Sequence, residues 1–402
     1  MSGFPGRLVI AAVLVAAPTA AGRTAEPARA PADAWPVARG CIEGTGVSAA
    51  TLHMPLVEAW RRAFDGTAFG TVPVIADGVV YVGDLDGTLH AVSLTDGTDR
   101  WSFTAEGAGF PSAAAVGRVG GSQLVVVGDD VGLVRAFDAG SGEIRWTYEM
   151  QGEISGGPTI VDGPDGPRVL VGSQDATLAC LGLATGKPIW KHEIADQIRC
   201  SPTVARTTAG DRVFLAGCDG KLHVIDVATG TETAAVPIDG PTGTTPASLG
   251  DHVFFGTEGG VFFAIDVVKG EVVWRAAAIA AGQSYRSSAA VTRDLAVVGF
   301  RGKAVEAFSA ADGGRAWRQP MRGRVEASPA IVSITGPDGA AERRVAIVAD
   351  SAGTIAALDA ATGAVVWDFD AGGGFGGGAA VADGRVVLAS DDGILWCFRS
   401  GD

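Results

Sequence analysis

The sequence predicts an all-β fold built from repeated units. A strand that ends in a small residue recurs eight times, at intervals of 45, 44, 45, 39, 43, 50 and 40 residues. The residues at these strand ends are Gly83, Gly128, Gly172, Gly217, Gly256, Gly299, Ala349 and Ala389. A period of about 40–50 residues is typical of propeller blades or solenoid units. The apolar residues alternate or run for short stretches, are rich in Val and are separated by Gly, which indicates strands and not helices.

A tryptophan marks the last strand of most units with the same period. Each unit has a Ser/Pro-rich strand, a strand that ends before an acidic turn, a third strand that ends in Asp-x-x-Thr-Gly, and the tryptophan strand. Four short strands per unit predict an eight-bladed β-propeller of four-stranded antiparallel blades. We expect the tryptophans to pack flat between adjacent blades. They are Trp60, Trp101, Trp146, Trp190, Trp274, Trp317 and Trp367, with Ala234 where one is missing.

The two ends of the repeat region predict how the ring closes. The last unit stops at Asp402 without a tryptophan strand, whereas Trp60 precedes the first complete unit. A strand near Leu56–Phe64 is therefore expected to complete the C-terminal blade, which closes the ring and protects the strand edges. Residues 56–402 would then form the propeller. The insertion Gly336–Glu342 is expected to be a loop between the first two strands of its blade.

Residues 1–21 have the pattern of a secretory signal peptide. One cation precedes the apolar run Leu8–Ala17, and small residues follow it. The run is shorter than the ~20 residues that cross a bilayer, so an uncleaved anchor is the less favoured alternative. We expect a mature protein that is secreted or periplasmic, without stable membrane insertion. Residues 22–34, rich in Ala, Pro and charge, are expected to be a flexible linker, and residues 35–55 lead into the propeller.

Composition excludes several classes of protein. Gly accounts for 59 of 402 residues, with 47% hydrophobic and 19% charged residues, so the chain is globular and rich in turns. Acidic residues outnumber basic ones by 45 to 31, and a net charge of -14 disfavours nucleic acid as a partner. The five cysteines contain no CxxC spacing, which excludes zinc ribbons, thioredoxin-like motifs and c-type haem attachment.

Two motifs resemble those of a known family. The Gly-Asp-x-Asp-Gly turn at residues 83–87, and the run from Ala357 to Trp367 that reads Ala-x-Asp-x-x-Thr-Gly-x-x-x-Trp, are similar to the pyrroloquinoline quinone (PQQ)-like β-propeller repeats. Residues 35–48 also resemble the start of secreted bacterial members without an established activity. The family includes the quinoprotein dehydrogenases and the outer-membrane assembly factor BamB. The resemblance covers about residues 35–399 and is closest in character to secreted, non-catalytic, BamB-like members.

The resemblance implies that a quinoprotein dehydrogenase would need a calcium-binding carboxylate cluster, a catalytic Asp and, in many members, two adjacent cysteines. No two cysteines are adjacent here, and the acidic turns at residues 84–87 and 391–393 lack the spacing of an EF-hand. The histidines are scattered along the chain: His53, His90, His192, His223 and His252. We therefore predict no catalytic residue, no cofactor and no metal site. PQQ and calcium are alternatives that no motif supports.

One pair of cysteines has a spacing that predicts a contact. If the first two strands of the fourth blade pair about a turn near residue 209, Ala205 faces Val213 and Cys200 faces Cys218. A cross-strand disulfide can then form in an oxidising compartment. Two buried thiols are the alternative, and a slip of one residue in register would remove the pairing.

The remaining candidate for function is a binding surface in the loops, where propellers carry their activities. Arginines gather in the sixth blade and its exits and form a basic patch on an acidic protein. We predict a partner site at the channel mouth and this patch, with a solvated face as the alternative; its residues are Tyr285, Arg286, Arg322 and Arg324. The sequence thus predicts a monomeric, non-catalytic scaffold that binds a protein or polymer of the cell envelope. A PQQ-dependent alcohol or sugar dehydrogenase is the alternative.

Overall fold

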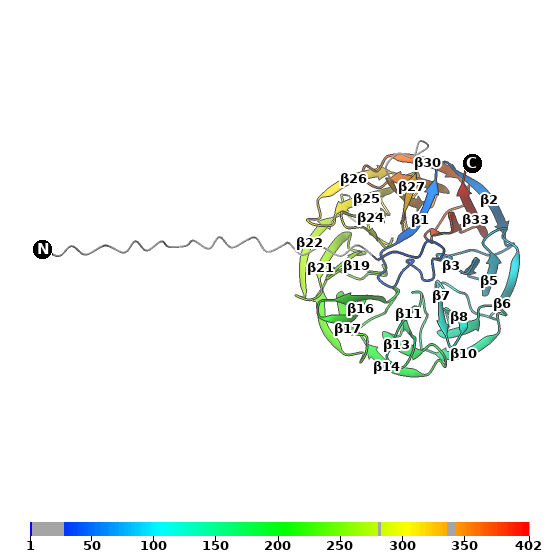
Figure 1. The fold of residues 1–402 in the computed structure, drawn as a ribbon, viewed down its shortest axis with the longest axis horizontal. Helices are drawn as coiled ribbons and strands as arrows, with labels where there is room; N and C mark the ends of the chain where they lie inside the picture. The colour runs from blue at the N-terminus through cyan, green and yellow to red at the C-terminus, as the bar shows by residue number, and fades with distance from the viewer. Residues whose placement is uncertain (2–27, 280–282, 336–342, 402) are drawn as a thin grey trace.

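Eight sheets surround a central axis in the computed structural model of the chain (Figure 1). The structure describes residues 1, 28–279, 283–335 and 343–401. These residues form strands and no helix, and every sheet is a four-stranded antiparallel blade, one of which carries a fifth strand. The predicted eight-bladed propeller is therefore confirmed. The predicted signal peptide and the predicted loop Gly336–Glu342 lie outside the described residues, apart from Met1.

Blades 1 to 7 take their four blade strands in chain order from the axis to the rim (Figure 1). Blade 1 consists of β3 (Val74–Ala76), β4 (Val79–Gly83), β5 (Thr88–Ser93) and β6 (Asp99–Thr104), and blade 2 of β7 (Ala115–Val119), β8 (Ser122–Gly128), β9 (Leu133–Asp138) and β10 (Ile144–Glu149). Blade 3 consists of β11 (Thr159–Val161), β12 (Arg168–Gly172), β13 (Thr177–Gly182) and β14 (Pro188–Glu193). Blade 4 consists of β15 (Thr203–Thr207), β16 (Gly210–Ala216), β17 (Lys221–Asp226) and β18 (Glu232–Pro237).

Blades 5 to 7 repeat the same order. Their strands are β19 (Ala247–Leu249), β20 (His252–Gly256), β21 (Val261–Asp266) and β22 (Glu271–Ala277); β23 (Ala290–Val291), β24 (Leu295–Phe300), β25 (Ala304–Ser309) and β26 (Arg315–Pro320); and β27 (Ala330–Thr335), β28 (Arg343–Ala349), β29 (Thr354–Asp359) and β30 (Val365–Asp370). Blade 8 combines three C-terminal strands with one N-terminal strand: β31 (Ala380–Ala382), β32 (Arg385–Ala389), β33 (Ile394–Ser400) and β2 (Leu56–Ala63).

Burial follows the position of a strand in its blade. The second strand of blade 3, β12, is buried along its whole length because the neighbouring blades cover both of its faces. The fourth strand, β14, lies at the rim, where exposed residues alternate with half-buried ones. The continuous apolar runs and the alternating runs of the sequence correspond to these two environments.

The N-terminal region closes the ring. β2 pairs antiparallel with β33, from Leu56 opposite Ser400 to Ala63 opposite Ile394, so an N-terminal strand completes the C-terminal blade as predicted. A further strand, β1 (Val47–His53), pairs in parallel with β27, the inner strand of blade 7. Two neighbouring blades thus hold the same N-terminal stretch.

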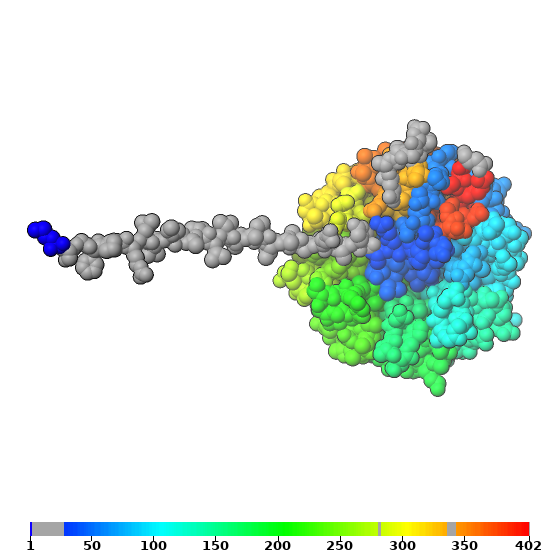
Figure 2. Space-filling model, in the orientation of Figure 1, coloured from blue at the N-terminus to red at the C-terminus, as the bar shows by residue number. Residues whose placement is uncertain are grey.

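The segment before β1, residues 30–46, fills the centre of the ring, and we call it the plug (Figures 1 and 2). Its backbone forms hydrogen bonds with the inner strand, or the turn after it, in blades 1, 2, 4, 5, 6, 7 and 8. Trp35 is fully buried and exchanges two backbone hydrogen bonds with Ile75, of 2.7 and 2.9 Å. Ala30 is also fully buried and pairs with Ser48. Packed structure therefore begins within the range predicted as a flexible linker, because the linker's last residues bind the channel wall.

Six tryptophans contact the next blade in one recurring way. Trp101 Nε1 donates to Ala139 O at 2.9 Å, and the ring covers Gly142, where an added Cβ would lie 2.7 Å from Cδ2. Each contacted glycine lies in the turn between the third and fourth strands and has a positive φ, which L-residues avoid. The pairs are Trp60 with Gly97, Trp101 with Gly142, Trp146 with Gly186, Trp190 with Gly230, Trp274 with Gly313 and Trp317 with Gly363.

Two interfaces depart from this pattern. At the junction of blades 7 and 8, Trp367 packs edge-on against Phe398 of β33, with ring centroids 5.5 Å apart. At the other interface Ala234 replaces the tryptophan, and Gly270 of blade 5 has no atom within 4 Å of an added Cβ. The propeller therefore lacks one of its eight aromatic contacts at the junction of blades 4 and 5.

Candidate functional site

A cleft of about 760 Å³ opens between blades 6 and 7, and we call it the basic cleft. Four cations line it: Arg301 and Lys303 follow β24, and Arg322 and Arg324 lie between β26 and β27. Ser351, which follows β28, also lines the cleft. No carboxylate is among the residues that line this cleft. Its volume falls in the range of about 300–1,000 Å³ that is usual for binding sites.

Backbone hydrogen bonds fix the walls of the basic cleft. Ser351 N donates to Arg324 O at 2.9 Å, and Arg324 N donates to Ser351 Oγ at 3.0 Å. Met321 N donates to Lys303 O at 2.9 Å. Gly323 N donates to the buried carboxylate of Asp350 at 2.7 Å. These bonds tie the loop between two blades to the turns on either side, so the cations are presented on a rigid frame.

Two of the four cations are paired and two are not. Arg322 Nη1 lies 2.7 Å from Asp370 Oδ2, and this hydrogen bond raises the pKa of Arg322 and lowers that of Asp370. Arg301 Nε lies 2.7 Å from Glu326 Oε1. Within the described part of the chain, the side chains of Lys303 and Arg324 have no such partner, and both are exposed. The cleft therefore holds an excess of positive charge.

The four residues of the predicted patch separate into three places. Arg322 and Arg324 line the basic cleft, whereas Arg286 forms an ion pair with Glu258 at 3.2 Å and lies at the channel mouth. Tyr285 is fully buried, so its assignment to a surface patch is wrong. An added Cβ at Gly256 would lie 2.3 Å from Tyr285 Cβ, which explains why this strand ends in glycine.

Tyr285 is buried for the same reason as apolar residues in other blades. Phe110 makes the equivalent contact at Gly83, where an added Cβ would lie 2.3 Å from Phe110 Cβ. The Tyr285 hydroxyl donates to Glu306 Oε2 at 2.6 Å, and burial beside this carboxylate raises the pKa of Tyr285. The aromatic residue after the fourth strand therefore belongs to the core of the propeller.

A smaller hollow of about 180 Å³ occupies the channel mouth, and we call it the axial cup. Its wall takes residues from all eight blades, and the plug contributes Ala38 and Arg39. Arg39 is only 4% exposed, and its Nη2 donates to Ala289 O at 2.9 Å and to Pro329 O at 2.8 Å. Burial lowers the pKa of Arg39 to about 10. The guanidinium thus joins the plug to blades 6 and 7.

Carboxylates of two acidic turns accept hydrogen bonds from backbone amides. Asp84 Oδ1 accepts hydrogen bonds from Asp86 N at 3.1 Å and Thr88 N at 2.7 Å, and Oδ2 lies 2.9 Å from His90 Nε2. In the turn of blade 8, Asp391 Oδ1 accepts from Gly376 N at 2.9 Å. Burial raises the pKa of Asp391. Asp84 therefore closes its own hairpin, whereas Asp391 joins the turn of blade 8 to the loop between β30 and β31.

The predicted disulfide between Cys200 and Cys218 is absent, and both thiols are free. β15 and β16 pair with Val204 opposite Val213, one residue out of the predicted register. The hairpin closes with Thr207 opposite Gly210, which has a φ of 111°, so only two residues form the turn. Cys200 therefore has no cross-strand partner at Cys218, and burial raises its pKa to about 12.

Comparison with known families places the chain. The family described as outer membrane protein assembly factor BamB matches residues 57–132, 130–209, 206–336 and 301–402. The chain belongs to the BamB family. The matches begin at β2 and continue to the last strand, so every blade of this BamB-family propeller is covered. No curated protein sequence matches the chain. Within the described residues, no helix is long and apolar enough to cross a lipid bilayer.

Solved structures share the fold at low sequence identity. BamB from Moraxella catarrhalis has a TM-score of 0.65 and 17% identity, and the match covers 86% of this chain and 100% of that one. The computationally designed protein Ika8 has a TM-score of 0.65 and 17% identity, over 84% and 98% of the two chains. Quinohemoprotein alcohol dehydrogenase from Comamonas testosteroni has a TM-score of 0.69 and 14% identity, over 92% and 82%. These likenesses concern the BamB-family fold alone.

Proposed function

We propose that this BamB-family propeller is a non-catalytic scaffold of the cell envelope that binds an acidic segment of a partner protein in the basic cleft. The observation that carries the proposal is the excess of cations in a rigid cleft of about 760 Å³, on a chain whose net charge is -14. A local positive field on an acidic protein steers an acidic segment to one place and repels it elsewhere.

Further observations support the proposed location in the cell envelope and the proposed role as a scaffold. Residues 1–21 have the pattern of a secretory signal peptide, and the family takes its name from an outer membrane protein assembly factor. Lys303 and Arg324 offer unpaired charges that a carboxylate-bearing segment can bind, while Arg301 and Arg322 can exchange their present partners for new ones. A partner in the envelope therefore needs a run of Asp or Glu.

The proposal is tested with a fluorescent ten-residue glutamate peptide as probe. We expect the peptide to bind the full chain, to bind more weakly as salt rises, and to lose at least tenfold in affinity in the double variant Lys303→Glu/Arg324→Glu. The matched control, Lys187→Glu/Arg206→Glu, makes the same charge change at exposed residues outside the cleft. Equal losses in the two double variants would contradict the cleft as the binding site.

A quinone-dependent dehydrogenase remains the second candidate, because one similar fold is a quinohemoprotein alcohol dehydrogenase. The axial cup holds about 180 Å³, which is small for a tricyclic quinone with its calcium ion, and Glu326 is the one carboxylate on its wall. The cup as built therefore does not fit that cofactor. Native mass spectrometry with added PQQ and calcium separates the two candidates: a stoichiometric, calcium-dependent adduct would favour the dehydrogenase.

A further inference from the structure

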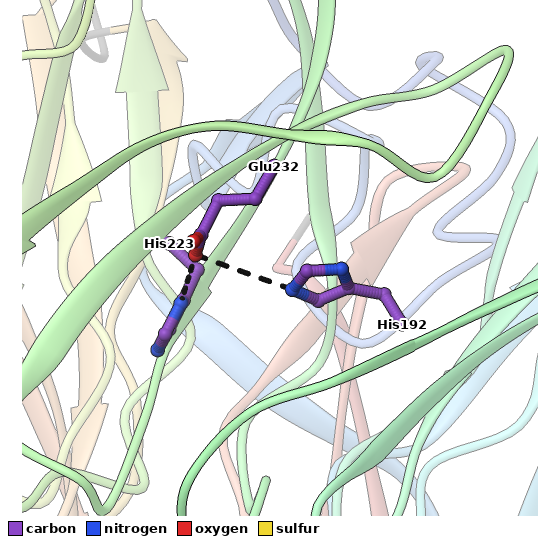
Figure 3. A group of neighbouring side chains, drawn as sticks. All are labelled: His192, His223 and Glu232. Carbon is purple, nitrogen blue, oxygen red and sulfur yellow. Dashed lines mark hydrogen bonds and ion pairs between the residues drawn. The ribbon is translucent and has the colours of Figure 1, made fainter.

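Two of the scattered histidines meet at the interface between blades 3 and 4 (Figure 3). His192 lies on β14 of blade 3, and His223 and Glu232 lie on β17 and β18 of blade 4. The Glu232 carboxylate lies between the two imidazole rings, and each ring turns a nitrogen toward it (Figure 3). Glu232 Oε1 is 2.5 Å from His223 Nδ1 and 4.0 Å from His192 Nε2. One ligand atom from each residue lies within 4.8 Å of the others.

A second carboxylate orients the buried histidine. His223 Nε2 lies 3.1 Å from Asp219 Oδ2, and both side chains are 5% exposed. A proton on Nε2 that is donated to Asp219 leaves the Nδ1 lone pair directed toward Glu232. Histidines that bind metal ions commonly donate their other ring N–H to a carboxylate, which fixes the tautomer and strengthens the ligand. Here Asp219 is the carboxylate that accepts from His223 Nε2, and His223 Nδ1 faces Glu232.

The interface between blades 8 and 1 has an analogous arrangement without the second histidine. There Arg62 takes the place of His192, two residues after the tryptophan of its strand, and Asp99 takes the place of Glu232, two residues before the next tryptophan position. Arg62 Nη2 donates to Asp99 Oδ2 at 2.7 Å, and His90 pairs with Asp84 as His223 pairs with Asp219. A guanidinium therefore bridges that interface, whereas at blades 3 and 4 the His192 imidazole occupies its position.

We propose that His192, His223 and Glu232 bind one divalent transition-metal ion of the zinc class, which clamps blade 3 to blade 4. Two imidazoles and one carboxylate are a ligand set that zinc takes with water in the fourth position. Asp219 acts as the positioning residue on His223. The side chain of Glu232 is 36% exposed and that of His192 is 17% exposed, which gives the ion a path from solvent.

The three ligand atoms have to move by up to about 1.5 Å relative to one another to hold the ion. Tetrahedral zinc with bonds of about 2.0–2.1 Å places its ligand atoms about 3.3 Å apart. The contact between His223 and Glu232, 2.5 Å, has to lengthen, and the separation between His192 and Glu232, 4.0 Å, has to shorten. Both changes are below 1 Å, and rotation of the Glu232 side chain supplies them. The ligand nitrogens of His192 and His223, which lie within 4.8 Å of each other, have to approach by up to about 1.5 Å, and rotation of the partly exposed His192 side chain supplies this movement.

The test is a zinc titration of the full chain, without a histidine tag, after dialysis against a chelator. We expect one equivalent of zinc to bind with a dissociation constant below about 1 μM and to raise the unfolding temperature. His192→Arg copies the Arg62 contact, so this variant keeps a cation beside Glu232, folds, and loses at least 100-fold in zinc affinity. Asp219→Asn is expected to lose about 10–100-fold. The control His252→Gln removes a histidine in blade 5 and binds zinc like the unaltered chain.

Two results would overturn the metal site. One is uptake of less than half an equivalent of zinc by the unaltered chain at 10 μM free ion. The other is equal zinc affinity in the unaltered chain and in folded His192→Arg. In either case the cluster is a network of polar contacts in which His192 occupies the position of Arg62.

Discussion

Glu306 is a fully buried carboxylate that depends on a few donors. The Tyr285 hydroxyl lies 2.6 Å from Oε2, while Arg315 Nε and Arg318 Nε lie 3.5 and 3.3 Å from Oε1. Removing one hydrogen-bond donor from a buried charged group costs about 1–3 kcal/mol. The stability of blade 6 therefore depends on a hydroxyl that the sequence suggested was on the surface.

Tyr285→Phe tests this dependence at the scale of one atom. We expect the variant to lose about 1–3 kcal/mol of unfolding free energy, measured by urea denaturation, because Glu306 loses its shortest hydrogen bond. Tyr148→Phe is the matched control, since Tyr148 is only half-buried on an outer strand, and it should change the free energy by less than about 0.5 kcal/mol. Similar losses in both variants would contradict the role of the buried pair.

Cys200 predicts a dependence of stability on alkaline pH. Burial raises the pKa of its thiol from 9.0 to about 12. Between these values the unfolded chain has lost the proton and the folded chain retains it, so rising pH favours unfolding. The stabilisation is complete below pH 9 and falls by about 1.4 kcal/mol per pH unit above it. Other buried thiols, such as Cys180 and Cys397, also have raised pKa values, so we expect Cys200→Ala to reduce the slope in urea unfolding between pH 9 and 11 by about 1.4 kcal/mol per pH unit and not to abolish it. Parallel curves for the variant and the unaltered chain would argue against a buried neutral thiol at Cys200.

At the scale of elements, the missing tryptophan provides a comparison within one molecule. Gly363 has a φ of 75°, and an added Cβ would lie 2.6 Å from Trp317 Cε3. Gly270 has a φ of 70°, but no atom lies within 4 Å of its added Cβ, because Ala234 replaces the tryptophan. Alanine at either position carries the same left-handed backbone strain of about 1–2 kcal/mol. The aromatic contact is the difference that the comparison tests.

Gly363→Ala is therefore expected to destabilise the propeller by at least about 1 kcal/mol more than Gly270→Ala, since the methyl group must displace the Trp317 ring. Thermal and urea unfolding of the two variants measure the difference. A difference near zero would indicate that the ring moves aside freely and contributes little to joining the blades.

Sequence predicted the elements well because each strand obeys a local pattern. Period, tryptophan position and turn residues identified the blades and the closing strand. The register of β15 and β16 was predicted wrongly by one residue. A two-residue turn and a three-residue turn both fit the same Thr- and Gly-containing stretch, and backbone dihedral angles decide between them. The contact between His192 and Glu232 was not predicted either. The sequence did contain the relevant pattern, because His192 lies two residues after Trp190 and Glu232 lies two residues before Ala234, the tryptophan position of the next unit.

At the scale of the whole molecule, the path of the plug across the ring could not be predicted from the sequence, although residues 35–48 resemble the start of secreted family members. Its hydrogen bonds use backbone atoms, which every residue provides, and its partners lie in seven different blades. No periodicity accompanies such a path, so residues 30–34 looked like a linker. Within the basic cleft, Arg301, Arg322 and Arg324 were visible as a cluster of arginines, whereas Lys303 joined them only through the fold.

Trp35→Ala tests whether the plug is part of the folded ring. Trp35 is fully buried, and deletion of such a ring costs about 3–5 kcal/mol. We expect lower stability and faster hydrogen exchange at Val204 and Val291, whose amides donate to plug carbonyls. If these amides exchange as slowly in the variant as in the unaltered chain, the plug stays in the channel without its tryptophan.

Because β2 pairs with β33, it has to wait during synthesis until the C-terminal strand has been made. Leu56 and Ser400 face each other but are 344 residues apart in the chain. At roughly 5–20 residues per second, the ribosome needs about 15–70 s to produce the partner of a strand that has already emerged. Until then β2 exposes unpaired backbone groups and half of an aromatic interface, which is the state in which β-rich chains associate wrongly. Protection of the nascent N-terminal region during this delay is therefore a requirement of the closed ring.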